Sequence, residues 1–316
     1  MSDNPTNSPE TGDYSASLLG TIRSHLESLQ GYDVMALELI QNADDAKAEE
    51  LVFDITDDGL RVWNSGEFTY CGALSRRPCP ALENGGYACD YHRITEVASG
   101  GKLSRSENIG RFGIGFVSAY QVTDHPVIHS GGIRLTLIPE RGKWQVAPLS
   151  DHKGTTFDFP WAFRADSEAR RALGISHVQS EHITQLINDF QEVLRRSLLF
   201  LRHLRKAEVR HNGRLLLSCD LDRKSDSELI ITFRPTEDRE QWLILRADSA
   251  ATASTLYKSH PRLAELKRNT QISIGIRVEP ESFKQGLLYA YLPTEQPTGL
   301  PLHINADFFP EGDRKS

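Results

Sequence analysis

The sequence has few cysteines, no long hydrophobic run and no excess of positive charge, and each absence excludes a class of protein. Four cysteines in 316 residues are too few for a disulfide scaffold. No stretch approaches the roughly eighteen apolar residues of a membrane helix, and the polar N-terminus MSDNPTNSPETGD lacks the apolar core of a secretion signal. With 43 acidic and 36 basic residues, the net charge of -7 gives no general attraction for phosphate. We therefore expect a cytoplasmic protein without a membrane span, in which this region does not bind nucleic acid directly.

The length and composition are sufficient for two globular domains. Hydrophobic residues make up 39% of the chain and charged residues 25%, which is ordinary for a soluble protein. Residues 1–13 are rich in Ser, Asn, Pro and acid, so we expect a disordered leader there. We place a first domain at residues 14–205 and a second at 206–316. The second ends without the signals of a finished domain, which predicts that it is truncated and continues in a longer protein.

Hydrophobic periodicity predicts an α+β fold. Apolar residues at three- and four-residue spacing predict helices from Tyr14, at 34–48 and at 181–203. Asp58-Gly59 and Asn212-Gly213 each lie between β-prone runs and predict hairpins. Further strands are expected within 127–161 and in the apolar runs after 228, with a helix around 250–268. The first half is therefore predicted to be an α/β sandwich with a largely antiparallel sheet.

Three polar stretches could form a functional site. In ALELIQNADDA, a helix would place Glu38, Asn42 and Asp45 within about 60° of arc beside an apolar face. An Asn oxygen can bind Mg²⁺ and a Glu can polarise water, although an isolated Glu-x-x-x-Asn is more often a solvated helix edge. In VWNSGEF, Asn64 and Gly66 end a predicted strand, where an amide and a glycine suit either a ligand contact or a turn.

The third stretch is the glycine-rich NIGRFGIGFVSAY at residues 108–120. A glycine loop that leads into a helix exposes backbone N–H groups and forms an anion site. Its order, G-x-x-G-x-G, is neither the dinucleotide fingerprint nor the P-loop, so the loop alone does not distinguish a phosphate site from a tight turn.

Taken in order, these stretches resemble a known family. ELIQNADDA, the hairpin to VWNSGEF, SGGK followed by IGRFGIGFVSAYQVTD, and GTTFDF are similar to the N, G1, G2 and G3 boxes of the GHKL ATPases across residues 14–165. GIGFVSAY resembles the heat-shock-chaperone branch, and ELIQNADDA with GRFGIGF resembles the sacsin type. The resemblance implies a Bergerat-type α/β sandwich ATPase domain, followed by part of a transducer or middle-like α/β domain.

The resemblance also implies a role for each matching residue. Glu38 would be the general base for water attack on the γ-phosphate, and Asn42, with Asp45 nearby, would bind Mg²⁺. Asn64 takes the place of the aspartate that accepts a hydrogen bond from the adenine amino group, with Gly66 passing close to the base and Thr155 supporting the adenine side. The residues implied to surround the phosphates are Lys102, Gly110, Arg111, Phe112, Gly113, Ile114, Gly115 and Phe116.

Two departures from the family pattern bear on activity. Asn64 can accept the adenine hydrogen bond, but it lacks the charge of an aspartate. Ala306, in LPLHINAD, occupies the position where the chaperones carry an arginine that reaches the γ-phosphate. Arg314 or Lys315 could replace that arginine; otherwise hydrolysis would be slow or would need a partner's arginine.

The leading hypothesis is therefore a Mg²⁺-dependent, ATP-binding and ATP-hydrolysing module. Closure of its lid would be coupled to conformational change or homodimerisation of a larger chaperone-like or remodelling protein. One alternative is a nucleotide-gated binding module with little turnover. Another is the ATPase of a DNA-linked machine of the MutL or MORC kind, including bacterial defence, although the acidic charge balance argues against direct DNA contact.

A separate cluster of metal-binding residue types lies in the expected lid insertion, 71–107. Cys71, Cys79, Cys89 and His92 make a complete tetrahedral zinc set, and the C-x-x-H spacing at its end is typical of a zinc knuckle. Asn84-Gly85 would turn a hairpin that brings Cys79 and Cys89 together. The alternative is three separate reduced cysteines, but a loop this polar offers little core in which to bury them. The sequence thus predicts zinc at the base of the lid.

Overall fold

The computed structural model describes residues 17–29, 31–84, 86–95, 115–259, 269–281 and 283–308. The predicted leader at 1–13 lies outside these residues. The described α-helices are α1 Leu18–Ser28, α2 Tyr32–Asp45, α3 Asp90–Thr95, α4 Glu168–Leu173, α5 Ser180–Ser197 and α6 Ala250–Ser259. The 3₁₀ helices are η1 Pro80–Asn84, η2 Gly115–Gln121, η3 Pro139–Arg141 and η4 Leu198–Phe200. Among the described residues, no helix combines the length and the apolar character that crossing a membrane requires.

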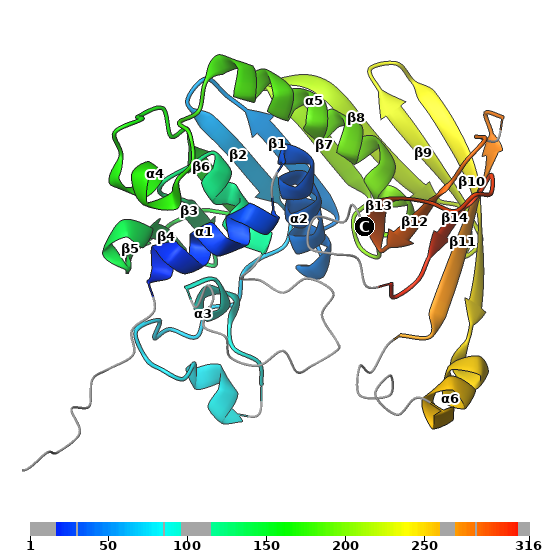
Figure 1. The fold of residues 1–316 in the computed structure, drawn as a ribbon, viewed down its shortest axis with the longest axis horizontal. Coiled ribbons are helices and arrows are strands. Elements are labelled where there is room, and N and C mark those ends of the chain that lie inside the picture. Colours follow the sequence, from blue (N-terminus) through cyan, green and yellow to red (C-terminus); the bar gives the residue numbers. More distant parts are fainter. Residues whose placement is uncertain are drawn as a thin grey trace, which may run out of the picture.

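The described strands form one continuous 14-stranded sheet. Its order is β13-β12-β14-β11-β10-β9-β8-β7-β1-β2-β6-β3-β4-β5 (Figure 1). The strands are β1 Glu50–Ile55, β2 Gly59–Asn64, β3 Val127–Ser130, β4 Ile133–Ile138, β5 Lys143–Pro148, β6 Thr155–Pro160, β7 Lys206–His211, β8 Arg214–Arg223, β9 Glu228–Arg234, β10 Asp238–Asp248, β11 Gln271–Glu279, β12 Leu287–Ala290, β13 Leu292–Pro297 and β14 His303–Asn305. The two halves of the chain join where β1 pairs in parallel with β7, with Leu51 opposite Ala207.

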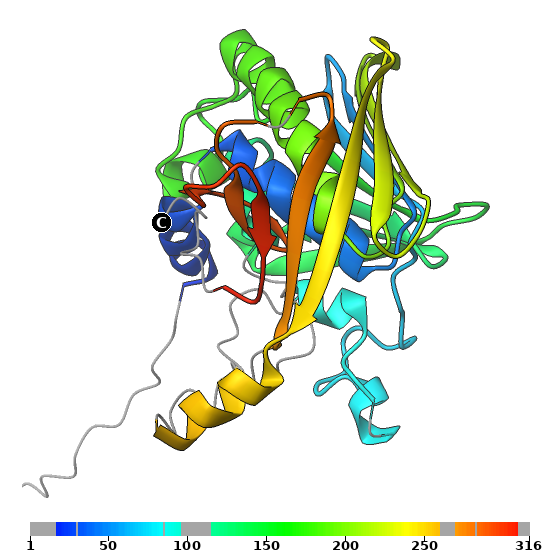
Figure 2. The same ribbon diagram turned by 90° about the vertical axis from the view of Figure 1, so that its right-hand side faces the viewer.

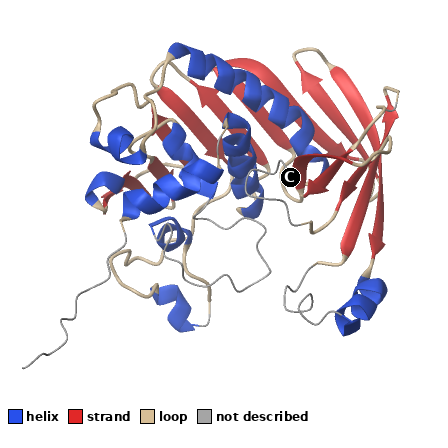
Figure 3. Ribbon diagram, viewed as in Figure 1, coloured by secondary structure: helices blue, strands red, loops and turns tan. Residues whose placement is uncertain are grey.

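Helices α1, α2 and α5 cover one face of this sheet (Figures 2 and 3). In β1, Leu51, Phe53 and Ile55 alternate with more exposed residues and are fully buried beneath the helices. Phe53 meets Phe190 of α5 edge to face, with ring centroids 4.9 Å apart. A single apolar cluster extends from α2 through α5 to the strands of the second half, so both halves share one core.

The predicted α+β class and both predicted hairpins are confirmed. The helix expected at 181–203 ends at Ser197 and continues as η4, and the expected lid insertion contains η1 and α3. The apolar run after the glycines forms the 3₁₀ helix η2, and α4 was not predicted. The predicted domain boundary between residues 205 and 206 stays a prediction. Strand β7 starts at Lys206 and pairs with β1 of the first half.

Candidate functional site

Helix α2 carries the first set of predicted residues. Its apolar side is buried, Glu38 is half-buried, and Asn42 is 4% exposed. Within the described residues, the Asn42 side-chain amino group is buried and has no hydrogen-bond partner. A buried donor without a partner is costly, so this position suits a bound acceptor. Asp45 is partly buried one turn further on.

Asp44, between Asn42 and Asp45, has a structural role that the sequence did not indicate. Its carboxylate accepts hydrogen bonds from the backbone N–H groups of Arg202, His203 and Leu204, at 3.1, 2.7 and 3.0 Å. Those residues lie between η4 and β7. The C-terminal end of α2 is therefore tied directly to the start of the second half of the chain.

A row of buried polar side chains crosses three adjacent strands on the helix-covered face. Asn64 of β2 is opposite Thr155 of β6, and Ser130 of β3 lies beside Thr155, with the two hydroxyl oxygens 2.8 Å apart. All three residues are at most 3% exposed. The Thr155 hydroxyl also donates to the Gly66 carbonyl at 2.8 Å. The predicted residues Asn64, Gly66 and Thr155 thus form one connected group.

Gly66 is held against the end of α2. A Cβ atom at this position would lie 2.7 Å from the carbonyl oxygen of Ala46, so no larger residue fits. The Gly66 N–H donates to Oδ1 of Asn64 at 3.0 Å. Because an N–H group can only donate, this bond fixes the orientation of the Asn64 amide and directs its amino group away from Gly66.

Helix α3 supports this row from the side. The buried Tyr91 hydroxyl donates to the backbone carbonyl of Ser130 at 2.7 Å. The first residue of α3, Asp90, accepts from both the N–H and the hydroxyl of Thr69, at 2.8 and 2.7 Å. Sequence reasoning missed Tyr91 and Ser130, because neither belongs to a motif with characteristic spacing.

Helix η2 follows the glycine loop and is firmly anchored. Phe116 is buried against Phe157 and Phe159, which fixes the start of η2 to the core. The fully buried Arg170 of α4 pairs with Asp124 at 2.6 Å. Its guanidinium also donates to the carbonyls of Tyr120 and Gln121 at the end of η2 and to that of Thr123 just beyond it.

The remaining predicted residues lie partly within and partly outside the described part of the chain. Gly115 is the first residue of η2, and Ala306 follows β14, where its N–H donates to the Tyr289 carbonyl at 3.1 Å. The predicted residues outside the described part of the chain are Lys102, Gly110, Arg111, Phe112, Gly113, Ile114, Arg314 and Lys315.

The structure brings together all four predicted zinc ligands. The sulfur atoms of Cys71, Cys79 and Cys89 and a ring nitrogen of His92 lie within 4.8 Å of one another. Cys79, Cys89 and His92 are buried, Cys71 is partly buried, and no disulfide joins the three cysteines. Burial raises the pKa of the Cys89 thiol to about 11.

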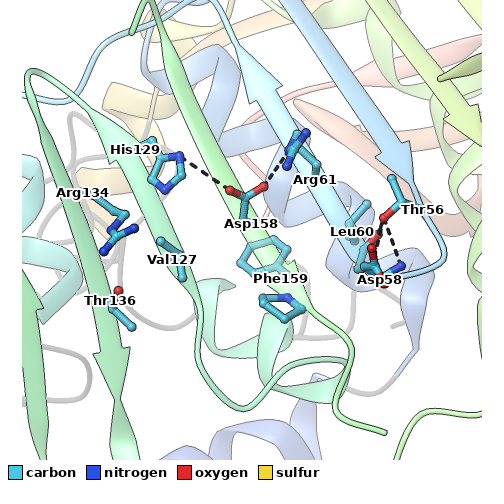
Figure 4. Close-up of a pocket in the computed structure, with 12 residues that line it drawn as sticks. Thr56, Asp58, Leu60, Arg61, Val127, His129, Arg134, Thr136, Asp158 and Phe159 are labelled. Carbon is cyan, nitrogen blue, oxygen red and sulfur yellow. Dashed lines mark hydrogen bonds and ion pairs between the residues drawn. The ribbon is translucent and has the colours of Figure 1, made fainter. Parts of the chain in front are cut away.

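A different hollow, of about 490 Å³, lies on the opposite face of the sheet (Figure 4). Asp158 is at its centre, 2.7 Å from Nε of Arg61 and 3.6 Å from Nδ1 of His129. Burial lowers the pKa of His129, and the charge of Asp158 opposes this shift. Because side chains alternate along a strand, Asp158 points away from the row that contains Thr155. Of the predicted nucleotide-binding residues that the structure describes, none lines this hollow.

Comparison with known proteins agrees with the motifs. Residues 15–145 match the Sacsin domain family. Human sacsin is 42% identical over 101 residues, which are 30% of this chain and 2% of sacsin. The Arabidopsis thaliana protein NO VEIN is 26% identical over 308 residues, which are 88% of this chain and 10% of that protein. The chain thus matches about a tenth or less of the length of either relative. The predicted resemblance to the sacsin-like branch is confirmed.

The fold also resembles a solved structure. The N-terminal domain of a DNA repair protein superposes with a TM-score of 0.50 and 12% sequence identity, covering 92% of this chain and 88% of that one. At this identity the likeness concerns the fold alone. It extends over both halves of the chain, including the second half that follows the Sacsin match.

Proposed function

We propose that this sacsin-like chain, with its Sacsin match at residues 15–145, binds ATP with Mg²⁺ and hydrolyses it. The observation that carries the proposal is the arrangement of α2 beside the row Asn64–Thr155–Ser130. The Gly66 carbonyl accepts from Thr155 of that row, and Gly66 packs against Ala46, one helical turn beyond Asn42. The N, G1 and G3 residues, far apart in sequence, therefore lie around one place in the fold.

Asn42 is suited to the magnesium side of such a site. Its amide is almost fully buried, and its amino group lacks a partner among the described residues. An oxygen atom of a bound phosphate would satisfy that amino group, and an amide oxygen is a ligand that Mg²⁺ accepts. Glu38, one turn earlier and half-buried, would take the proton from the attacking water.

The resemblance further suggests that lid closure is coupled to movement of the second half and to homodimerisation within a longer protein. The contacts of Asp44 support a mechanical link, because its carboxylate binds three successive N–H groups ahead of β7. A shift of α2 on nucleotide binding would thereby reach the second half. A client protein or remodelled partner would bind the longer chain.

The variant Glu38→Ala tests the catalytic assignment. We expect nucleotide binding to persist while phosphate release falls about 100-fold or more, which is the usual contribution of a general base. Calorimetric binding of a non-hydrolysable ATP analogue and a phosphate-release assay measure the two quantities. Glu49→Ala is the matched control, since Glu49 is exposed just beyond α2 and should leave both unchanged. Turnover at the parent rate in Glu38→Ala would refute the role of Glu38.

A second candidate is a nucleotide-gated binding module that hardly turns over. Ala306 favours it, because this position carries no cationic side chain where the chaperones have their arginine. This module would bind Mg²⁺-nucleotide tightly and release negligible phosphate in the parent protein. A rate that increases on adding DNA would instead favour a DNA-linked ATPase.

A further inference from the structure

We propose that Cys71, Cys79, Cys89 and His92 bind one structural Zn²⁺ ion, which fixes α3 to the chain segments beside it. The four donors come from the loop after β2, from the residue just before η1, and from the first turn of α3 with the residue before it. Cys89 and His92 are three positions apart, which places both on one side of a helical turn. The zinc proposal does not depend on ATP binding.

The distances suit tetrahedral zinc. Nδ1 of His92 lies 3.4 Å from the sulfur of Cys71 and 3.2 Å from that of Cys89. With Zn–S near 2.3 Å and Zn–N near 2.0 Å, a tetrahedral ion holds sulfur and nitrogen about 3.5 Å apart. The imidazole nitrogen therefore needs to move away from these two sulfur atoms by only a few tenths of an ångström. Four protein donors leave no open position, which makes the site structural rather than catalytic.

The hydrogen bond of His92 orients the ring for metal binding. Nε2 lies 2.9 Å from the backbone carbonyl oxygen of Arg76. A carbonyl can only accept, so Nε2 carries the proton and the lone pair of Nδ1 faces the sulfur atoms. Zinc-bound histidines usually use a second-shell partner in this way. His92 is fully buried, so water cannot compete for this arrangement.

The sulfur of Cys79 also receives a backbone hydrogen bond. The backbone N–H of Cys89 points at the sulfur of Cys79, 3.4 Å away. Such N–H groups stabilise a thiolate, the form that binds metal. Cys219 offers the contrast: it is a free, buried cysteine in β8, outside the cluster. Three thiolates with one imidazole form a soft ligand set that selects zinc over magnesium or calcium.

Zinc would supply the rigidity that this region needs. Helix α3 has six residues, too few for a helix to be stable by itself. It nevertheless carries Tyr91, whose hydroxyl holds the Ser130 carbonyl beside Thr155. An ion bound to Cys89 and His92 would fix the helix from which Tyr91 extends. The zinc site thus supports the polar row without touching it.

Metal analysis of the purified 316-residue chain tests the proposal. After dialysis against metal-free buffer, we expect about one zinc per chain, and X-ray absorption at the zinc edge should show three sulfur neighbours and one nitrogen. Cys89→Ser should lose most of the metal, while Cys219→Ser, which removes an equally buried thiol, should retain it. Zinc-free parent protein, or full zinc content in Cys89→Ser, would overturn the proposal.

A second measurement keeps the test decisive if Cys89→Ser does not fold. Titrating the parent with a mercurial reagent in the presence of a zinc-sensitive dye should release zinc in step with modification of three thiols. A chelator should also lower the Tm of the parent. Thiol modification without zinc release, or a Tm unaffected by stripping the metal, would contradict a structural site.

Discussion

At the scale of single residues, the orientation of Asn64 has the clearest functional consequence. Its oxygen accepts from Gly66, so its amino group is the end that a ligand would meet. An amino group cannot accept a hydrogen bond from the adenine amino group, whereas it can donate to a ring nitrogen or to a carbonyl of another base. We therefore expect weak discrimination between ATP and GTP.

Replacing Asn64 with aspartate should restore that discrimination. One carboxylate oxygen would accept from Gly66 and the other from the adenine amino group. A charge-assisted hydrogen bond of this kind should raise the preference for ATP over GTP about tenfold or more, equivalent to roughly 1.4 kcal/mol. Competition binding with a fluorescent nucleotide measures the ratio. Asn305→Asp changes another buried asparagine, one that accepts from Tyr291, and should leave the ratio unchanged; an equal change in both variants would argue against a base contact.

Residue types with a strict spacing could be predicted from the sequence, and isolated ones could not. The four zinc donors were found because Cys-x-x-His and three close cysteines form a recognisable set, and the structure gathers them. Ser130 was missed because its role comes from strand register, and Tyr91 because its role depends on where α3 packs. Ser130 faces Thr155 only because of the way in which β3 pairs with β6. The register between strands that are distant in sequence cannot be predicted from local sequence patterns.

At the scale of elements, short helices matter more than their length suggests. Helix α4 has six residues and no long periodic pattern, which explains why it was not predicted. It nevertheless places Arg170 against the end of η2, directly downstream of the predicted phosphate loop. Helix α2, in contrast, was predicted within about two or three residues at each end. Its 14 residues are long enough to show a clear helical repeat of apolar residues in the sequence.

Arg170→Met should destabilise the protein strongly. The change leaves the carboxylate of Asp124 and the carbonyls of Tyr120 and Thr123 without their donor in a buried place. Breaking a buried ion pair in this way costs about 3–5 kcal/mol. Urea unfolding followed by circular dichroism measures the loss. Arg164→Met removes an exposed arginine that pairs with Asp166, and its midpoint should match the parent. Equal midpoints for all three proteins would show that the contacts of Arg170 do not contribute to stability.

At the scale of the whole molecule, one core joins the two halves, so a destabilising change in the second half lowers the free energy of unfolding of the whole chain. His303 of β14 causes such a destabilisation at acid pH. It is stacked on Trp242 and Phe283, and its Nδ1 accepts from the Leu287 N–H at 2.9 Å. Burial lowers its pKa to about 4, compared with 6.5 in the unfolded chain.

Stability should therefore fall as the pH is lowered from about 6.5 towards 4. In this window the unfolded chain binds a proton at His303 that the folded chain does not, which favours unfolding. With allowance for partial exposure of the ring, the loss is on the order of 2 kcal/mol. Urea midpoints at pH 7.5, 6 and 5 measure it. His303→Asn keeps an acceptor near Leu287 but does not titrate, so its midpoint should fall less; identical pH profiles would rule out this contribution.

The parallel pairing of β1 with β7 has a consequence for how the chain acquires its structure. His211, the last partner on β7, lies 156 residues after Ile55 of β1. During synthesis at about 5–20 residues per second, one edge of β1 stays unpaired for about 10–30 seconds after the strand has been made. That edge belongs to a strand with three fully buried apolar side chains, and open edges of this kind promote aggregation. Completion of the sheet is thus a late, long-range event, and the newly made N-terminal half depends on protection until β7 arrives.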